Sequence, residues 1–154
     1  NCSTAFHFIP FNISLTMKWK AVEQFSVDHN YIDGEGILHK GSISARRGES
    51  VIIPVNMKEG ILLGVGKGNE EWNQSAPHGS GRRLKREEVK QRHTVSEFKK
   101  EMKGVYSSCV GAETLDEAPF AYRSMEEIAG QIKDTVEITE VLRPLYSFKA
   151  GSRR

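Results

Sequence analysis

The chain has 154 residues, of which 38% are hydrophobic and 27% are charged, and its formal net charge is +2 at pH 7. This length suits one domain or part of a larger one, and no apolar run is long enough for a transmembrane helix. Cys2 and Cys109 are too few and too far apart for a disulfide framework or a zinc site, so we expect a reducing, cytoplasmic setting and no membrane.

The first element in chain order is predicted over residues 17–27, where apolar side chains recur at roughly helical spacing. This predicted helix leads directly into Asp28-His29-Asn30. Gly34 and Gly36 follow, and they indicate a turn.

A series of short strands is predicted next. The apolar runs are Ile43, Val51-Ile52-Ile53 and Ile61-Leu62-Leu63, and glycines separate them. Such spacing is typical of strands joined by tight turns. Gly64, Gly66 and Gly68 then predict a flexible loop, which lacks the spacing of a Walker phosphate loop.

Two helices are predicted from capping boxes. Thr94 precedes Glu97 by three residues, and Gly104 supplies a C-terminal stop. Ser124 and Glu127 repeat the pattern. The expected buried faces are Phe98 and Met102 in the first helix, and Ile128, Ala129 and Ile132 in the second.

The last predicted element covers residues 135–148, where Val136 and Ile138 alternate with polar residues before Pro144. We interpret this region as one or two strands. Runs of strands beside separate helices favour an α+β fold over a parallel α/β sheet.

A basic segment lies between residues 82 and 103, with nine Lys or Arg and four Glu. A phosphate backbone would be attracted to such a surface. The alternative, which the segment taken alone favours, is a solvated helix of mixed charge.

The segment with the clearest chemistry is Ala76-Pro77-His78-Gly79-Ser80-Gly81-Arg82. Glycines let a backbone approach an anion closely, and arginine offers a planar fork of donors that matches phosphate oxygens. The imidazole of His78 is suited to act as a nucleophile, a general base or a metal ligand. Taken alone, the segment is more typical of a tight turn that carries an incidental histidine.

Several short blocks in a fixed order make the pattern more specific. They are Asp28-His29-Asn30-Tyr31, Leu38-His39-Lys40-Gly41-Ser42, Ile52-Ile53-Pro54-Val55-Asn56-Met57, Gly64-Val65-Gly66-Lys67-Gly68-Asn69, the His78 segment, Leu115-Asp116-Glu117-Ala118-Pro119-Phe120-Ala121-Tyr122 and Phe148-Lys149-Ala150. This order resembles the C-terminal part of the RtcB family of RNA ligases. These enzymes use GTP and Mn²⁺ to join RNA ends bearing a 3′-phosphate or 2′,3′-cyclic phosphate to a 5′-hydroxyl end, in RNA repair and tRNA splicing.

The resemblance assigns residues 22–154 to the C-terminal portion of an RtcB-like catalytic domain and leaves residues 1–21 unmatched. It implies an α+β fold in which antiparallel sheets are flanked by helices. It also implies that the N-terminal part of the family fold lies outside this chain.

The resemblance also implies a site. His78 would be the catalytic nucleophile that becomes guanylylated. Gly79, Ser80 and Gly81 would offer donors to the phosphates, and Arg82 would balance charge nearby. The loop that cradles guanosine would be Pro54, Val55, Asn56 and Met57, and the base would meet Tyr122 and Lys149. Ile61 stands where the family has a serine that touches the nucleotide.

His29 matches a family histidine that binds Mn²⁺. The resemblance also implies that Asn30, the next residue, contributes to nucleotide binding. Imidazole is an acceptable manganese ligand when carboxylates join it. One histidine cannot hold a metal, and the remaining family ligands belong to the N-terminal part. Without the resemblance, a lone histidine is more often structural.

Two hypotheses follow. The first is a GTP- and Mn²⁺-dependent RNA ligase that acts through a GMP-histidine intermediate. The second is a catalytically incomplete nucleotide- or RNA-binding fragment that lacks most metal ligands. The second hypothesis expects that the 154-residue chain alone neither guanylylates itself nor ligates. The RNA substrate, the oligomeric state and the need for an activating protein partner stay open.

Overall fold

The computed structural model describes residues 3–7, 24–28 and 30–149, with side chains from Asn30 to Lys149. Its strands are β1 (Ser3–His7), β2 (Gln24–Asp28), β3 (Asn30–Ile32), β4 (Leu38–Lys40), β5 (Ser42–Ser44), β6 (Ser50–Asn56), β7 (Gly60–Gly66), β8 (Ser75–Pro77) and β9 (Val136–Leu142). The α-helices are α1 (Arg86–Arg92), α2 (Val95–Glu101) and α3 (Met125–Gln131), and the short 3₁₀ helices are η1 (Glu70–Trp72), η2 (Ala112–Glu117) and η3 (Pro119–Ala121).

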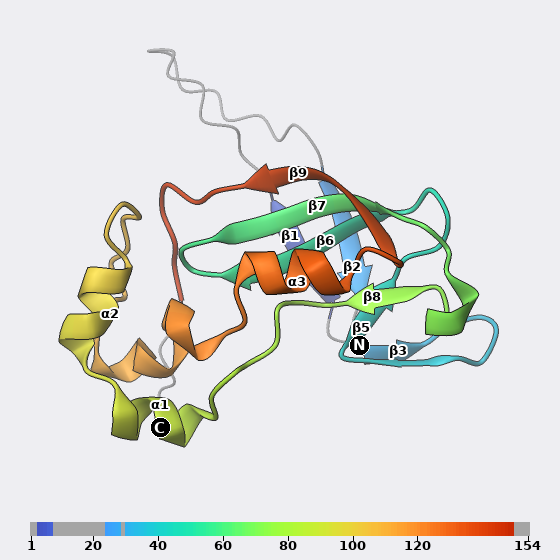
Figure 1. Cartoon of the computed structure of the whole chain (residues 1–154). Helices are drawn as coiled ribbons and strands as arrows, with labels where there is room; N and C mark the ends of the chain where they lie inside the picture. Colours follow the sequence, from blue (N-terminus) through green and yellow to red (C-terminus); the bar gives the residue numbers. More distant parts are fainter. Residues whose placement is uncertain (1–2, 8–23, 29, 150–154) are drawn as a thin grey trace, which may run out of the picture.

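All the paired strands are antiparallel, in the sheets β1–β2, β3–β4, β5–β8 and β6–β7–β9. Figure 1 shows α3 lying across the β6–β7–β9 sheet, while α1 and α2 lie together at one end of the molecule. The expectation of an α+β fold with antiparallel sheets is confirmed at this level. No helix in the described ranges is long and apolar enough to cross a membrane.

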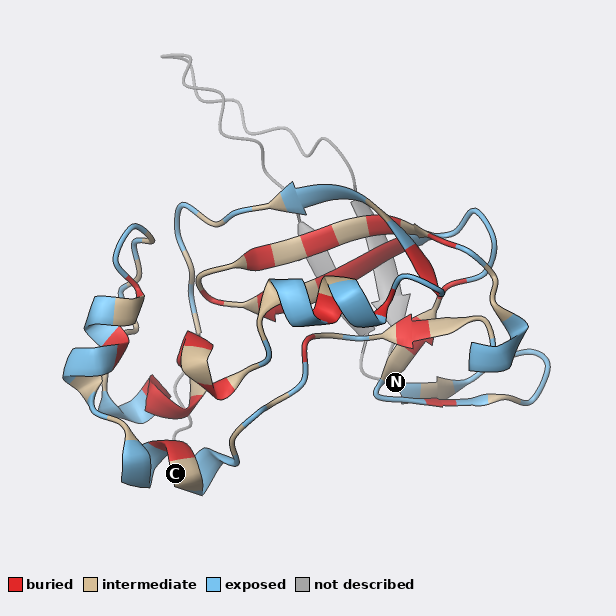
Figure 2. Cartoon of the chain, viewed as in Figure 1, coloured by how far each residue is buried: buried red, intermediate tan, exposed pale blue. Residues whose placement is uncertain are grey.

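The β6–β7–β9 sheet carries the main core. Burial alternates along β7, which Figure 2 shows as successive buried and intermediate residues. The face of the sheet and α3 share one apolar cluster, which includes Val51, Ile53 and Leu62 from the sheet with Ile128 and Ile132 from the α3 region. The predicted strands and the predicted capping box at Ser124 are therefore confirmed.

A second cluster lies under α1, α2, η2 and η3. Val89 and Phe98 are fully buried there, and Met57 reaches the cluster from the end of the β6 segment. The Thr94–Glu97 capping box is present, and Gly104 has φ +97° after the helix ends. This cluster places the η2–η3 region beside the β6–β7 hairpin.

The predicted loop at Gly64 and Gly66 is wrong, because both residues belong to β7. A Cβ at Gly64 would lie 2.6 Å from the Glu137 carbonyl oxygen, and one at Gly66 would lie 2.4 Å from the Ala45 carbonyl. These glycines therefore allow close packing of neighbouring backbone rather than flexibility.

The helix predicted over residues 17–27 is wrong at its C-terminal end. Residues 24–28 form β2, which pairs with β1 in the register Ser3↔Asp28 to His7↔Gln24. Phe25 and Val27 alternate with polar residues, so a period of two was also present in the sequence. Residues 17–23 lie outside the described residues.

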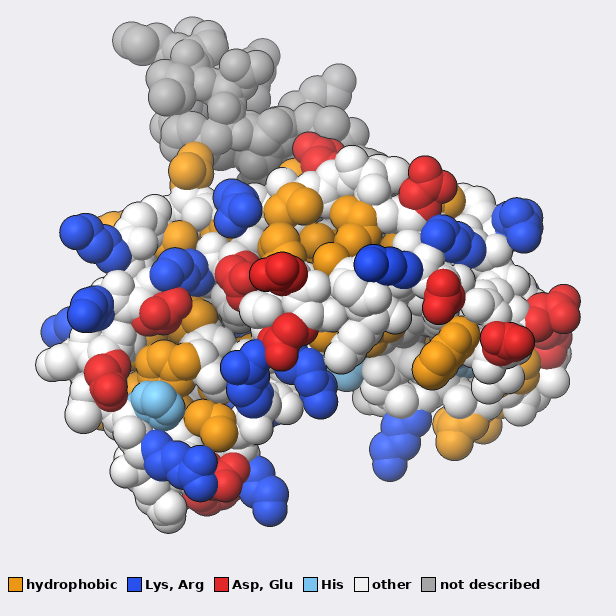
Figure 3. Space-filling model, viewed as in Figure 1, with side chains coloured by type: hydrophobic (Ala, Val, Ile, Leu, Met, Phe, Trp, Pro, Cys, Tyr) orange, Lys and Arg blue, Asp and Glu red, His pale blue; other side chains and the backbone are white. Residues whose placement is uncertain are grey.

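The basic segment forms α1 and α2, each with one buried apolar residue and otherwise solvated, mixed charges. Figure 3 shows Lys and Arg side chains interspersed with Asp and Glu on the visible face. Ion pairs join Arg83 to Glu127 and Arg86 to Asp116. Carboxylates therefore neutralise part of the basic surface that the sequence displays.

Candidate functional site

A pocket of about 840 Å³ lies where the β6–β7 hairpin, the His78 segment and the C-terminal segment meet. Its lining includes the predicted residues Pro54, Val55, Asn56, Met57, His78, Gly79, Ser80, Gly81, Arg82, Tyr122 and Lys149. Asn30 lies outside this lining, and His29 lies outside the described residues. Residues far apart in sequence thus converge on one cavity.

The imidazole of His78 is oriented by the backbone of Gly41. Nδ1 lies 2.6 Å from the Gly41 carbonyl oxygen. Because a carbonyl oxygen can only accept, Nδ1 carries the hydrogen, and the lone pair of the neutral ring is on Nε2. The Gly41 N–H in turn donates to Asn30 Oδ1 at 3.1 Å. Asn30 therefore helps to position the His78 ring indirectly, because it holds the Gly41 backbone.

The segment after His78 is tied to β6. The Ser80 N–H donates to the Pro54 carbonyl at 3.1 Å, and its buried hydroxyl donates to the Val55 carbonyl at 2.7 Å. A Cβ on Gly79 would lie 3.2 Å from the Pro54 carbonyl oxygen, so glycine permits this close approach. The Ser80 hydroxyl, which we expected to face a phosphate, fixes the segment against β6.

The amide of Asn56 closes the β6–β7 hairpin. Its Oδ1 accepts from the backbone N–H groups of Lys58 and Glu59, and its Nδ2 donates to Glu59 Oε2 at 2.6 Å. Val55 and Met57 on either side are buried, and neither has positive φ. The prediction of a guanosine loop is therefore wrong in its local structure, because Pro54, Val55 and Asn56 belong to β6 and only Met57 follows the strand; all four residues line the pocket.

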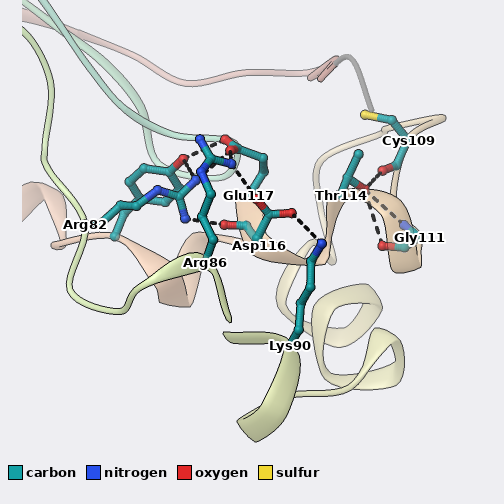
Figure 4. Close-up of polar contacts among 9 residues, drawn as sticks. Arg82, Arg86, Lys90, Cys109, Gly111, Thr114, Asp116 and Glu117 are labelled. Atoms are coloured by element: carbon teal, nitrogen blue, oxygen red, sulfur yellow. Dashed lines mark hydrogen bonds and ion pairs between the residues drawn. The ribbon is translucent and has the colours of Figure 1, made fainter. Parts of the chain in front are cut away.

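Arg82 and Tyr122 form a polar rim with Glu117 and Asp116 (Figure 4). Arg82 Nη1 donates to the Asp116 carbonyl at 2.5 Å, and Nη2 donates to Glu117 Oε1 at 2.5 Å and to the Tyr122 hydroxyl at 2.9 Å. The guanidinium also lies 4.7 Å from the centre of the Tyr122 ring. Arg82 is thus a structural cation of the pocket wall, held by several acceptors.

The rim has a defined charge state. Burial opposes ionisation of Glu117, but the Tyr122 hydroxyl, Lys149 and Arg82 together hold the pKa of its carboxyl below the ordinary value. Burial raises the pKa of Tyr122, and the Glu117 carboxylate raises it further. At neutral pH the pair is therefore a carboxylate that accepts from a neutral phenol.

The C-terminal segment forms the remaining wall. Tyr106 fixes it through two backbone bonds, from its N–H to the Leu145 carbonyl and from the Ser147 N–H to its own carbonyl. The Lys149 N–H lies 3.0 Å from Cys109 Sγ, and its ammonium lies 3.3 Å from Glu117 Oε2. Sequence reasoning identified Lys149 but missed the neighbouring lining residues Pro144, Tyr146 and Phe148.

A second pocket of about 510 Å³ has the same segment in its lining. His78, Gly79, Ser80 and Gly81 line both cavities, and the exposed Trp72 lines the second. The catalytic candidate thus borders two cavities.

Within residues 30–149, no group of three or more His, Cys, Asp or Glu side chains is arranged to hold a metal ion. His39 has two polar neighbours. Its Nε2 lies 3.1 Å from Asp33 Oδ2, and its Nδ1 lies 3.1 Å from Ser75 Oγ. His39 is 3% exposed and stacks on Tyr31, so it joins β3 and β4 to β8.

The chain was compared with known proteins. A family model described as tRNA-splicing ligase RtcB matches residues 9–150, and so includes residues ahead of position 22. The RNA-splicing ligase RtcB of Escherichia coli K12 is 32% identical over 136 residues, which cover 84% of this chain and 33% of that protein. The tRNA-splicing ligase RtcB of Aeropyrum pernix is 34% identical over 106 residues, which cover 64% of this chain and 22% of that protein.

The chain therefore spans about a third of the length of its Escherichia coli relative. The matched stretch contains all the described residues of the 840 Å³ pocket. On the family match, the chain belongs to the RtcB family of RNA-splicing ligases.

Proposed function

We propose that this chain carries the nucleotide-bearing portion of a GTP- and Mn²⁺-dependent RNA ligase. The enzyme joins an RNA 3′-phosphate or 2′,3′-cyclic phosphate end to a 5′-hydroxyl end through a GMP-histidine intermediate at His78. The observation that carries this proposal is the convergence of His78, residues 54–57, Tyr122 and Lys149 on one pocket in a chain of this family.

The orientation of His78 supports the first step. With the hydrogen on Nδ1, Nε2 offers its lone pair to the α-phosphorus of GTP. The new N–P bond forms as the bond from the α-phosphorus to the bridging oxygen breaks, and pyrophosphate leaves. An RNA 3′-phosphate oxygen then displaces the histidine, and the 5′-hydroxyl finally attacks that phosphate and releases GMP.

The dimensions and chemistry of the pocket support a nucleotide. Its volume of about 840 Å³ is in the range of small-molecule sites, and its wall is mainly apolar with cations at one rim. The 510 Å³ cavity, which shares His78 and Gly79 with the first pocket, offers space for an RNA end beside the nucleotide.

Manganese enters this proposal from the family resemblance alone. Bound Mn²⁺ would neutralise the triphosphate charge. The donor set found in residues 30–149 does not fit a metal site, and we derive no step through the ion.

The second candidate is a binding fragment without catalysis. The observation that supports it is that residues of this chain by themselves form the 840 Å³ pocket. Such a fragment would bind GMP in the 840 Å³ pocket and would join no ends.

An end-joining assay separates the two candidates. A 3′-phosphate RNA and a 5′-hydroxyl RNA are incubated with GTP, Mn²⁺ and the polypeptide encoded by the complete reading frame that contains this chain. We expect a joined product with the unmodified protein and none with His78→Ala. His93→Gln is the matched control, because His93 stacks on Phe120 in the helical cluster and does not line the pocket. No joined product from the unmodified protein would contradict the ligase proposal.

A further inference from the structure

Glu117 connects four side chains, of which Arg82, Tyr122 and Lys149 line the 840 Å³ pocket. Its Oε1 accepts from Arg82 Nη2 at 2.5 Å and from Arg86 Nη1 at 2.7 Å. Its Oε2 accepts from the Tyr122 hydroxyl at 2.6 Å and lies 3.3 Å from Lys149 Nζ. Figure 4 shows the carboxylate between the two arginines, at the end of η2.

Glu117 is mostly buried, unlike the carboxylate of a surface ion pair. Its side chain is 14% exposed, so its charge depends on the surrounding donors. Glu117 is absent from the residues that line the pocket, whereas Arg82, Tyr122 and Lys149 all line it. Glu117 can therefore influence a bound nucleotide only through these neighbours.

Lys149 depends on this contact more than the others do. Its backbone is anchored by the N–H contact to Cys109 Sγ, but that contact leaves the four-carbon side chain free to rotate. The ion pair with Glu117 Oε2 is the contact in the described structure that fixes its ammonium. A fixed ammonium loses less conformational entropy when a ligand binds to it.

We propose that Glu117 is a positioning residue that holds the Lys149 ammonium so that the pocket prefers guanine to adenine. This inference rests on the proposed function, in which the pocket takes a guanine nucleotide. An ammonium can only donate hydrogen bonds; both purines present an acceptor at N7, but guanine presents the acceptor O6 where adenine presents an amino donor. A donor held in one place discriminates between these edges, whereas a freely rotating lysine does not.

The test compares binding of GMP and AMP by calorimetry, without metal, to the unmodified chain and to variants. We expect the unmodified chain to bind GMP more tightly than AMP. Glu117→Gln keeps the shape of the side chain and removes its charge, and it should reduce the GMP/AMP affinity ratio about tenfold, the value of one weakened charge-assisted hydrogen bond. Glu117→Asp keeps the charge on a shorter side chain, so its GMP/AMP affinity ratio should lie between those of Glu117→Gln and the unmodified chain.

Two further comparisons separate positioning from general stability. Glu101→Gln removes a carboxylate that pairs with Lys58 at 3.0 Å away from the pocket lining, and it should leave the ratio unchanged. Lys149→Gln should lower the ratio by itself, and adding Glu117→Gln to it should lower the ratio little further, because both changes act on one contact. A Glu117 that merely stabilised the fold would leave the ratio unchanged, and losses that add would show that Glu117 and Lys149 act independently.

The outcomes are distinguishable. An unmodified chain that binds GMP no better than AMP contradicts the proposed function. A clear GMP preference that survives in Glu117→Gln, or losses that add in the double variant, overturns the positioning inference. If Glu117→Gln does not fold, Glu117→Asp carries the test, and an unchanged ratio in that variant likewise overturns it.

Discussion

The Nδ1 atom of His78 donates a hydrogen bond to the carbonyl oxygen of Gly41 across 2.6 Å. Gly41 has φ +68°, a conformation that L side chains rarely adopt, and its N–H is held by Asn30 Oδ1. The nucleophile proposed for this protein is therefore oriented by a glycine in the left-handed conformation, which lies 37 residues earlier in the chain.

Gly41→Ala tests this relationship. A Cβ there meets only the His78 ring at an ordinary 3.7 Å, so the cost arises from the backbone conformation, about 1–2 kcal/mol. We expect the turn to shift and the rate of His78 guanylylation in the complete protein to fall at least tenfold. Gly36→Ala is the matched control, since Gly36 has φ +82° with nothing within 4 Å. Equal rates for the two variants would contradict the assignment.

Ser80→Ala should affect stability rather than nucleotide binding. The Ser80 hydroxyl donates to the Val55 carbonyl in a buried position, so its loss leaves that oxygen without this donor. We expect the free energy of unfolding to fall by about 1–3 kcal/mol in urea titrations. GMP affinity should stay within twofold, and a large loss of affinity would show that the hydroxyl reaches the nucleotide. Ser96→Ala, on the exposed face of α2, should change neither quantity.

Stability should depend on pH through Glu117. Its folded-state pKa lies below the ordinary value of 4.5, so its carboxylate contributes stability that is fully present above that value. This contribution is lost as the pH falls from about 4.5 through the folded pKa. The difference in unfolding free energy between the unmodified chain and Glu117→Gln should therefore be largest near neutral pH and shrink below pH 4.5. A difference that grows on acidification would contradict the charge state.

Gly66→Ala and Gly130→Ala should act in opposite directions. A Cβ at Gly66 would lie 2.4 Å from Ala45 backbone atoms, so we expect a loss of about 2–3 kcal/mol in the free energy of unfolding. Gly130 lies in α3 with nothing within 4 Å of an added Cβ, and alanine there should add about 0.5–1 kcal/mol. Thermal melting of the two variants against the unmodified chain measures both. An unchanged melting temperature in Gly66→Ala would contradict the close packing of Gly66 against Ala45.

The features that the sequence predicted well are governed by local rules. The capping boxes at Thr94 and Ser124 and the strands at residues 51–53 and 61–63 follow from neighbours within a few residues, and all are present. Gly64 and Gly66 were misread because their small size serves contacts with residues 136–137 and 45–46, and a local pattern does not encode such distant neighbours.

The candidate site also combines features that the sequence predicted with contacts that it did not predict. The resemblance to the RtcB family implies that His78, residues 54–57, Tyr122 and Lys149 share one nucleotide site, and these residues line one pocket. The sequence did not indicate that Ser80 would bind β6, that Arg82 would serve the pocket wall, or that Glu117 would hold Lys149. Side-chain partners are decided by three-dimensional packing, so a residue type at a matching position does not specify which group it contacts.

The central claim is that the imidazole of His78 forms a covalent bond to GMP. The complete polypeptide is incubated with GTP labelled at the α-phosphate and with Mn²⁺, resolved on a denaturing gel, and mapped by mass spectrometry. The account predicts an acid-labile GMP adduct on His78 that is absent from His78→Ala and present in His93→Gln. An adduct that persists in His78→Ala, or a complete protein that takes no label, would contradict it.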